Sequence, residues 1–250
     1  MGTMGSTHKF GVLDLIRAGL QDLDMARELL DELHADGIDD DQLHLLMETL
    51  EKTCDPDVAL RNLVDIIKAL QSQGRDFRQV ITDNEGLVRL VTVLGVSDEM
   101  GKLMRFRPEL VMAAASDSCE SHLYNHAQRR AHVLEAVGAD PADNRMPKAT
   151  KPLAEAATAL RQTYRKQLAA IMAQDATADD PIEIQSRISQ ELSDLADAAL
   201  EGALAIARNE VDGSEHVRFA IIGMGKLGAR ELNYVSDVDP VSYTHLTLPT

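Results

Sequence analysis

Hydrophobic residues return every three or four positions through the first two thirds of the chain, which is the period of an amphipathic α-helix. One such stretch begins after Asp55, a suitable N-cap, with Pro56 at the first helical position. Its apolar positions are Leu60, Leu63, Ile67 and Leu70. Residues 84–110 predict two shorter helices, with a break near residues 95–98 and a stop at Pro108. This part of the chain therefore predicts helices joined by short polar breaks.

The longest predicted helix lies toward the end of this helical region. Residues 138–152 contain three prolines and few apolar residues, which predicts a loop or linker. Helical spacing resumes after it, and in residues 176–211 Asp180 is a suitable cap and Pro181 suits the first turn. One apolar stripe follows, formed by Ile188, Leu192, Leu195, Ala199, Ala203 and Ile206. We therefore expect residues 1–211 to be helical.

The pattern changes after this helix. Residues 217–222, VRFAII, form a short apolar run typical of a buried β-strand. A glycine-rich loop, GMGKLG, follows, and residues 229–235 have room for about two helical turns. Residues 236–239, SDVD, should enter a second strand. The sequence therefore predicts a mainly α protein, with a helical region over residues 1–211 and the start of a different domain over residues 212–239.

Composition and charge narrow the classes of function. Hydrophobic residues make up 44% of the 250 positions but aromatic residues only 3%, so the core must be mostly aliphatic, which suits helix-on-helix packing. The formal net charge of −16 argues against a general nucleic-acid-binding protein but leaves room for a basic pocket that binds one nucleotide. Two cysteines, no secretory signal and no bilayer-spanning apolar run favour a cytoplasmic protein without a membrane partner.

The glycine-rich loop suggests phosphate binding. Gly223, Gly225 and Gly228 match the G-x-G-x-x-G pattern of dinucleotide-binding proteins. Against a dinucleotide, the following helix would be very short, and no acidic residue lies at the distance needed to bind the ribose. Lys226 inside the loop instead indicates direct contact with a phosphate, although no Ser or Thr follows it as a Walker A motif requires. A tight structural turn is the alternative without a ligand.

Two aspartates form the next candidate site. Asp237 and Asp239 are two positions apart, so in a strand their carboxylates would project from the same face. Paired carboxylates suit Mg²⁺, and metal ions held there could stabilise the attacking and leaving oxygens of a nucleotidyl transfer. Ser236 could hydrogen-bond a phosphate. A polar loop is the simpler alternative, because Asp-x-Asp is common by chance.

A zinc site is a further hypothesis. Cys119, His122 and His126 lie at helical spacing and could bind Zn²⁺ on one face of a helix. A fourth ligand is not evident, and His132 lies too far along the helix to join them without a bend. A partly exposed helix face is the simpler interpretation.

The strand, the loop and the aspartates together are more specific than any one of them. The order VRFAII, GMGKLGARELNY, SDVD resembles the nucleotidyltransferase domains of the glutamine synthetase adenylyltransferase/deadenylylase family. The matching residues are Gly223, Gly225, Lys226, Leu227, Gly228, Glu231, Leu232, Tyr234, Ser236, Asp237 and Asp239. The chain departs from the family pattern at Ala229 and Val235. These departures would affect the conformational freedom of the loop and not the residues that take part in the reaction. The upstream helices also resemble the N-terminal helical region of actinobacteria-like members, so the resemblance covers residues 45–239.

The resemblance implies a fold and an activity. It implies the truncated start of an α+β, polymerase-beta-like nucleotidyltransferase domain, the first of two. That domain would remove AMP from a tyrosine of glutamine synthetase by Mg²⁺-dependent phosphorolysis that releases ADP, and the second would add AMP. A PII-type nitrogen-signalling protein is a further partner that we consider.

The resemblance also implies roles for individual residues. Asp237 and Asp239 would be catalytic Mg²⁺ ligands. The phosphates of the nucleotide (ADP or ATP) would be held by Gly223, Gly225, Lys226, Gly228 and Ser236.

The last eleven residues depart from this pattern. After Asp239 an apolar strand is expected, but Pro240 removes a donor that the strand would need. The following residues resemble translated read-through of a sequencing adapter, so we expect residues 240–250 to be non-native and the catalytic domain to be incomplete and inactive.

Two other classes of function stay open. One is a helical module that binds glutamine synthetase or a nitrogen-signalling protein without chemistry. The other is a dinucleotide-dependent oxidoreductase.

Overall fold

A computed structural model describes residues 9–81, 83–116 and 125–241, and within them it contains helices and no β-strand. The expected mainly α fold is therefore confirmed. The chain divides into two compact units. The first unit comprises Met1–Leu123 and Arg161–Gln185, and the second comprises Tyr124–Leu160 and Ser186–Thr250.

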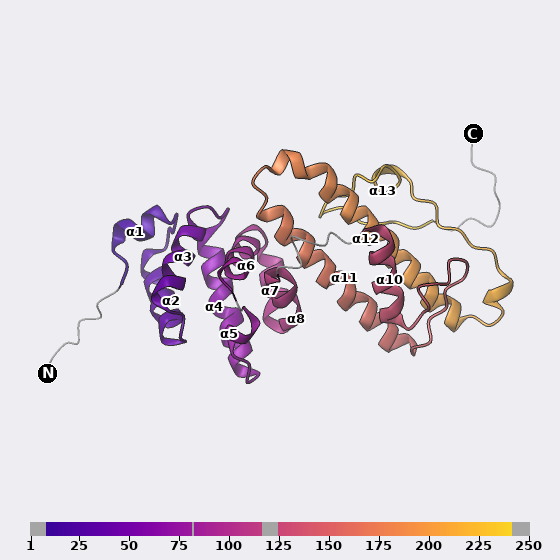
Figure 1. The fold of residues 1–250 in the computed structure, drawn as a ribbon, viewed down its shortest axis with the longest axis horizontal. Helices are drawn as coiled ribbons and strands as arrows, with labels where there is room; N and C mark the ends of the chain where they lie inside the picture. The colour runs from indigo at the N-terminus through magenta and orange to yellow at the C-terminus, as the bar shows by residue number, and fades with distance from the viewer. Residues whose placement is uncertain (1–8, 82, 117–124, 242–250) are drawn as a thin grey trace. The chain divides into compact units, whose positions relative to one another are not determined.

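The first unit is built from short helices (Figure 1). They are α1 (Val12–Arg17), α2 (Leu23–Ala35), α3 (Asp40–Leu50), α4 (Pro56–Ser72), α5 (Phe77–Val80), α6 (Asn84–Val96), α7 (Asp98–Phe106) and α8 (Pro108–Ala115). The second half of α11 (Leu153–Ala176) and the first residues of α12 (Pro181–Glu210) belong to the same unit.

Helix α4 lies at the centre of the first unit. It packs against α2, α6 and α7, while α6 also packs against α3 and α8. The predicted apolar positions of α4 are all buried: Leu60, Leu63, Ile67 and Leu70. The predicted cap is also confirmed, since the Asp55 carboxylate accepts a hydrogen bond of 3.0 Å from the Val58 N–H. The predicted break falls at Ser97, which caps α7.

The second unit is formed by α10 (His126–Val137), the first half of α11 and most of α12, followed by the 3-10 helix η1 (Ser214–His216) and α13 (Gly225–Ala229). A buried ion pair joins α10 to α12, with 2.7 Å between Arg129 Nη2 and Glu191 Oε2. The Arg129 side chain is 2% exposed and that of Glu191 8%. Neighbouring Arg130 binds Glu201 of α12 through two nitrogens, at 2.8 Å each.

Residues 138–152 are not helical, as predicted, but they are packed more closely than a linker would be. Arg130 Nη1 donates a 2.7 Å hydrogen bond to the Pro141 carbonyl, and Arg208 Nη1 donates one of 3.1 Å to the Pro147 carbonyl. Ala149 is buried, and its N–H donates to the Ala205 carbonyl at 3.0 Å. Arg130 of α10 and Arg208 of α12 therefore hold this proline-containing loop by hydrogen bonds to its carbonyls.

The predicted start of α12 is confirmed, and its predicted stripe is partly wrong. The Asp180 carboxylate accepts hydrogen bonds from the Ile182 and Glu183 N–H groups at 2.9 and 3.2 Å. Of the predicted stripe, Ala203 is exposed and Ala199 only half-buried. The buried face instead continues through Leu195, Ala198, Gly202, Ala205 and Ile206. The steps of three and four residues keep this face aligned, whereas repeated steps of four move away from it.

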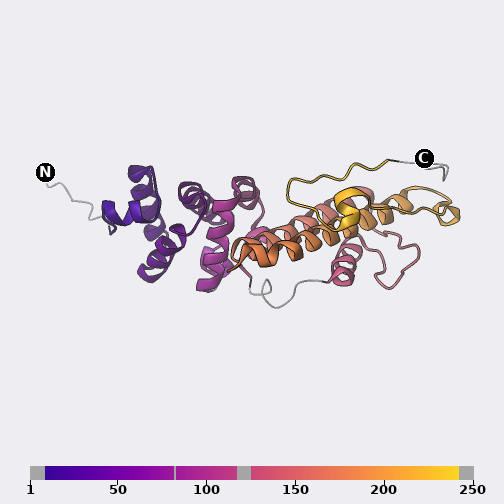
Figure 2. The same ribbon diagram turned by 90° about the horizontal axis from the view of Figure 1, so that it is seen from above.

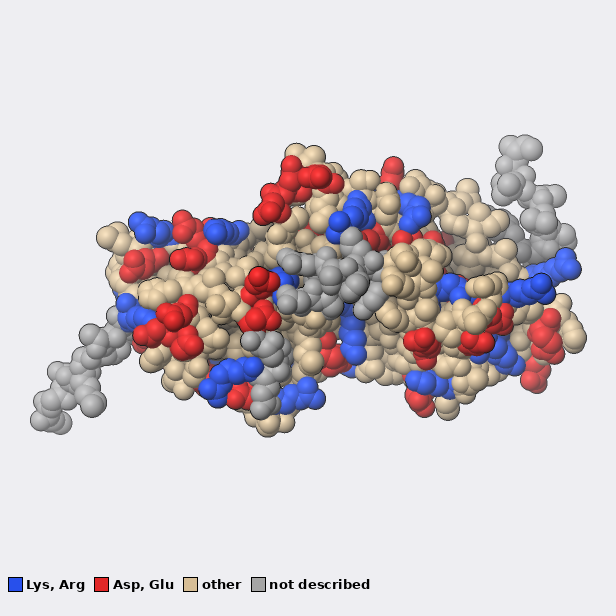
Figure 3. All heavy atoms as spheres, viewed as in Figure 1, with Lys and Arg blue, Asp and Glu red and all other residues tan. Residues whose placement is uncertain are grey.

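Charges are distributed over the surface without a single basic face in the view of Figure 3, where basic side chains lie among acidic ones. None of the helices in the described parts of the chain combines the length and apolarity needed to cross a membrane.

Candidate functional site

The glycine-rich loop folds as one short helical turn. Helix α13 begins at Gly225, whose φ of 58° is a left-handed conformation that suits glycine. The loop then closes on itself at Gly228, where a Cβ atom would lie 2.5 Å from the Gly223 carbonyl oxygen. A side chain at position 228 would therefore force these two backbone segments apart. Lys226 is exposed, and its contact with a phosphate stays a prediction.

The predicted buried strand before this loop is not formed in the described residues. Residues 217–222 form no strand in the structure, and their side chains are exposed, with Phe219 57% and Ile222 75% exposed. A strand needs a neighbouring strand to pair its N–H and C=O groups, and the described residues provide none. Without a strand before the loop and with only five residues in α13, the arrangement required for dinucleotide binding is not present in the described residues.

The two helical turns predicted for residues 229–235 are also absent. Helix α13 ends at Ala229, and Arg230 has a φ of 60°. The N–H groups of Arg230 and Glu231 donate to the carbonyls of Leu227 and Lys226, at 3.1 and 2.8 Å, which closes the helical turn. The left-handed conformation at Arg230 directs the chain away from the helix axis.

Ser236, Asp237 and Asp239 lie in an irregular segment and not in the predicted second strand. The Ser236 hydroxyl donates a 2.8 Å hydrogen bond to Asn233 Oδ1 in a local turn. Asp237 and Asp239 are exposed, and no cluster of three metal-ligating side chains among the described residues includes either of them. Their role as Mg²⁺ ligands stays a prediction.

The sequence did not reveal where this segment attaches to α12, beside which α13 lies (Figure 1, Figure 2). The guanidinium of Arg230 forms an ion pair with Asp194. The N–H of Leu232 donates a 3.3 Å hydrogen bond to Ser193 Oγ, and the Leu232 side chain is buried. No signal in the sequence indicated this contact, because polar residues such as Ser193 and Asp194 are expected between the apolar positions Leu192 and Leu195 of an amphipathic helix.

A group of ligand atoms adjoins this attachment. His126, Asp194 and Asp197 each offer one possible metal ligand, and these atoms lie within 4.8 Å of one another. Burial raises the pKa of the Asp197 carboxyl, and the Asp194 charge adds to this effect, while His126 and Arg230 oppose it. Arg230 already supplies a cation to Asp194. Of the hypothetical zinc ligands, Cys119 and His122 lie outside the described residues.

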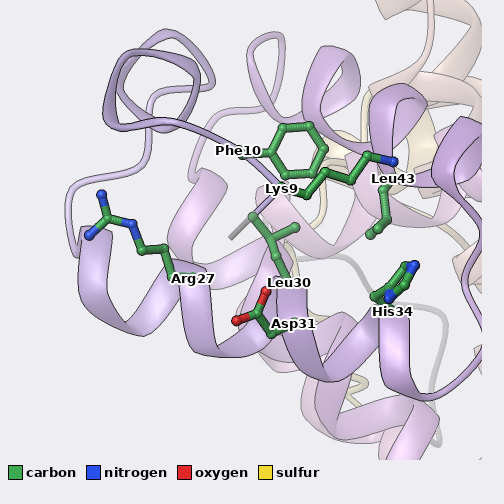
Figure 4. A pocket seen from close by; sticks show the side chains of 7 residues that line it. All are labelled: Lys9, Phe10, Arg27, Leu30, Asp31, His34 and Leu43. Atoms are coloured by element: carbon green, nitrogen blue, oxygen red, sulfur yellow. The ribbon is translucent and has the colours of Figure 1, made fainter. Parts of the chain in front are cut away.

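A pocket of about 110 Å³ lies in the first unit (Figure 4). It is lined by Lys9, Phe10, Arg27, Leu30, Asp31, His34 and Leu43. The Lys9 ammonium group at its edge is already paired with Asp40, and this pairing lowers the pKa of the Asp40 carboxyl. None of the residues predicted from the sequence to bind nucleotide or metal lines this pocket.

Comparison with known proteins identifies the family. The sequence model of the family described as glutamate-ammonia ligase adenylyltransferase matches residues 87–247. The chain therefore belongs to this family.

Three curated relatives illustrate the match, and each is described as a bifunctional glutamine synthetase adenylyltransferase/adenylyl-removing enzyme. The relative from Bifidobacterium longum (strain DJO10A) is 69% identical over 234 residues, which cover 94% of this chain and 22% of the relative. The relative from Cutibacterium acnes is 35% identical over 228 residues, which cover 91% of this chain and 22% of the relative. The relative from Mycobacterium avium is 35% identical over 209 residues, which cover 81% of this chain and 20% of the relative. The chain thus spans about a fifth of the length of these relatives, and no solved structure matches it significantly.

Proposed function

We propose that this chain is part of a bifunctional enzyme that removes AMP from a tyrosine of glutamine synthetase and, through a region outside this chain, adds it. The observation that carries the proposal is the order of the glycine loop, Ser236, Asp237 and Asp239 in a chain of the adenylyltransferase family. The relatives' descriptions name both adenylyl transfer and adenylyl removal. We assign adenylyl removal to the domain that begins in this chain, because its motif follows the N-terminal helices.

The proposed reaction is a phosphorolysis. An oxygen of inorganic phosphate forms a bond to the adenylyl phosphorus, and the bond from that phosphorus to the tyrosine oxygen breaks. The electron pair stays on the leaving tyrosinate, which takes a proton from water, and the other product is ADP. Mg²⁺ would neutralise charge on the phosphoryl oxygens when bound.

The exposed residues of the motif fit these ligands chemically. Asp237 and Asp239 offer carboxylate oxygens, the donors that Mg²⁺ prefers, and both are accessible. Lys226 offers a cation from an exposed loop whose close backbone turn depends on Gly228. Ser236 offers a hydroxyl that would exchange its local bond to Asn233 for one to a phosphate. A nucleotide, phosphate and Mg²⁺ are therefore the proposed ligands.

We further propose that residues 217–222 and 236–239 become strands of a nucleotidyltransferase sheet when its remaining strands are present. Residues 217–222 support this, because they combine β-forming residues with exposed apolar side chains. We expect the whole enzyme to act in the cytoplasm, where Cys54, a free cysteine, would stay reduced.

The test uses the full-length protein that contains this sequence. We expect it to release ADP from adenylylated glutamine synthetase when phosphate and Mg²⁺ are supplied. Asp237→Asn or Asp239→Asn should lower the rate of ADP release at least about 100-fold, because loss of a metal ligand removes several kcal/mol of transition-state stabilisation. The AMP-adding reaction of the same variants should continue, which shows that they are folded.

A matched control is Asp212→Asn, which changes an exposed aspartate outside the motif and should leave ADP release unchanged. Unchanged ADP release in both motif variants would contradict the proposed roles of Asp237 and Asp239. ADP release by the 250-residue chain alone would contradict the expectation that this chain lacks a complete catalytic domain.

A second candidate function is a binding module for glutamine synthetase or a PII-type signalling protein. The distribution of the hydrophobic cores favours it, because among the described residues neither core cluster includes any of residues 217–241. Binding of either partner by residues 1–211, together with normal ADP release in the Asp237 and Asp239 variants, would favour this function over catalysis.

A further inference from the structure

The segment that carries the proposed catalytic residues is fixed to the helical unit at one place. Between residues 217 and 241, all of which are described, Leu232 is the one buried side chain. Two residues before it, Arg230 forms an ion pair with Asp194. Both contacts lie between the glycine loop, which ends at Gly228, and the residues proposed to hold metal and phosphate, which begin at Ser236.

The two residues of α12 that receive the segment, Ser193 and Asp194, are both buried. Ser193 is fully buried, and its hydroxyl donates a 2.8 Å hydrogen bond to the Ser189 carbonyl, which leaves an oxygen lone pair for the Leu232 N–H. Asp194 is 7% exposed, and a carboxylate so deeply buried is costly unless a cation pairs with it. The bond to Ser189 lies within α12 and orients the Ser193 hydroxyl independently of the segment, whereas the buried Asp194 carboxylate obtains its counter-charge from Arg230 of the segment.

The backbone conformation of Arg230 is energetically unfavourable, which indicates that the contacts of the attachment hold it in place. A non-glycine residue in the left-handed region is disfavoured, and it persists when surrounding contacts hold it there. Arg230 is the one non-glycine residue with such a φ among the described residues. Its side chain pairs with Asp194 while its backbone ends α13, so one residue both turns the chain and attaches it.

We propose that Arg230 is a positioning residue for the adenylyl-removing reaction, and that through Asp194 and Ser193 helix α12 sets the distance between the glycine loop and Asp237 and Asp239. This role rests on the proposed function. In this role Arg230 acts through Asp194, because one nitrogen of its guanidinium pairs with that buried carboxylate. The helical region thus contributes part of the framework of the catalytic site.

The first experiment needs no enzymatic activity. Hydrogen exchange of the Leu232 amide is measured in the 250-residue chain and in its Arg230→Ala and Asp194→Asn variants. Both variants should exchange this amide at least about tenfold faster, because opening the attachment exposes the N–H that Ser193 accepts. Arg218→Ala is the matched control, since it removes an exposed arginine of the same segment and should leave the exchange unchanged.

The second experiment measures kinetics in the full-length protein. Arg230→Ala should lower kcat for ADP release about 10- to 100-fold with little change in KM for phosphate, because it displaces the reacting groups without removing a phosphate ligand. Arg230→Lys should retain part of kcat. Asp194→Ala is measured beside it, and the Arg230→Ala/Asp194→Ala double variant should be no slower than the slower of these two single variants, because both changes remove the same interaction.

The outcomes separate this proposal from the proposed function. Unchanged Leu232 exchange in both variants would overturn the attachment. A raised KM for phosphate with unchanged kcat, or additive losses in the double variant, would instead make Arg230 a substrate ligand and overturn its positioning role. Normal ADP release in Arg230→Ala beside a large loss in Asp237→Asn would overturn this role and support the proposed function. No ADP release by the unaltered full-length protein would overturn both.

Discussion

The helical units and the segment of residues 217–241 contain the same kinds of side chain in opposite surroundings. Ile66 of α4 is fully buried, whereas Ile222 is 75% exposed. An amphipathic helix satisfies its backbone internally and needs only a neighbour for its apolar face. A strand needs partners for its backbone as well. The comparison teaches that apolar sequence alone does not bury a segment when the described residues offer it no strand to pair with.

The same difference separates the attached part of the segment from the rest. Leu232 is buried because its N–H and the neighbouring Arg230 find partners on α12. Val235, three residues further along, is largely exposed. Where polar groups are satisfied by a helix, an apolar side chain of the segment is buried too. Four pairs of substitutions test this comparison, with the same change made in each region.

The largest effect is expected at the buried ion pair of the second unit. Glu191→Gln should destabilise the chain by about 3–5 kcal/mol, because it removes the carboxylate charge that pairs with the buried Arg129 guanidinium. The matched change in the segment, Glu231→Gln, alters an exposed carboxylate and should have little effect. Urea unfolding followed by circular dichroism measures both. Equal stability of the two variants would show that the Arg129–Glu191 pair does not hold α10 to α12.

The next effect tests the apolar core directly. Ile66→Ala should cost about 2–5 kcal/mol in the free energy of unfolding, because it leaves a cavity in the core of the first unit. Ile222→Ala should stay within about 0.5 kcal/mol of the unaltered chain. If Ile222→Ala is as destabilising as Ile66→Ala in the same urea titration, then Ile222 is buried in solution and the contrast between the two regions is contradicted.

A smaller effect is expected from glycines. In α6, a Cβ atom at Gly95 would lie 1.8 Å from Thr53 Cγ2, so Gly95→Ala forces the buried Thr53 to move. We expect a net loss of about 1–3 kcal/mol in thermal or urea unfolding. Adding Thr53→Ser, which removes this methyl group, should recover part of the loss. Gly223→Ala is the matched change, and its Cβ would lie 3.3 Å from the flexible Leu227 side chain, so its effect on stability should be small.

The smallest effect concerns pH. Because burial raises the pKa of Asp197, the folded state holds the proton of that carboxyl to higher pH than the unfolded state does, and stability falls as pH rises through this interval. Asp197→Asn should therefore be slightly more stable than the unaltered chain at pH 7, and this gain should vanish below about pH 4, where both states are protonated. The matched change in the segment, Asp237→Asn, alters an exposed carboxylate and should have little effect on the free energy of unfolding at pH 7. A gain that persists at pH 3 would point to a cause other than titration.

Local features of this fold were predictable from the sequence. The Asp55 and Asp180 caps and the buried residues of α4 depend on neighbours within a few positions, and they were predicted correctly. The order of the candidate site residues was also visible, and it led to the family.

Features that depend on distant residues were not predictable in the same way. The Arg230–Asp194 pair joins residues 36 positions apart, and nothing in the local pattern of either residue specifies the other. The predicted strand at residues 217–222 does not form here, because the pattern reports what a segment could form and the described residues contain no partner strand. The loop of residues 138–152 similarly became ordered through arginines on two helices that its own composition does not reveal.

The position of Ser193 and Asp194 in the chain has a consequence for biosynthesis. A polypeptide leaves the ribosome from its N-terminus, and units that fold through nearby contacts form early. Both α10 and α12 precede Arg230, so the surface that receives Arg230 and Leu232 is synthesised before the residues that bind to it. The nascent glycine motif therefore emerges beside a helix that is ready to hold it. The helical region would then act as an intramolecular template for the domain that follows it during translation.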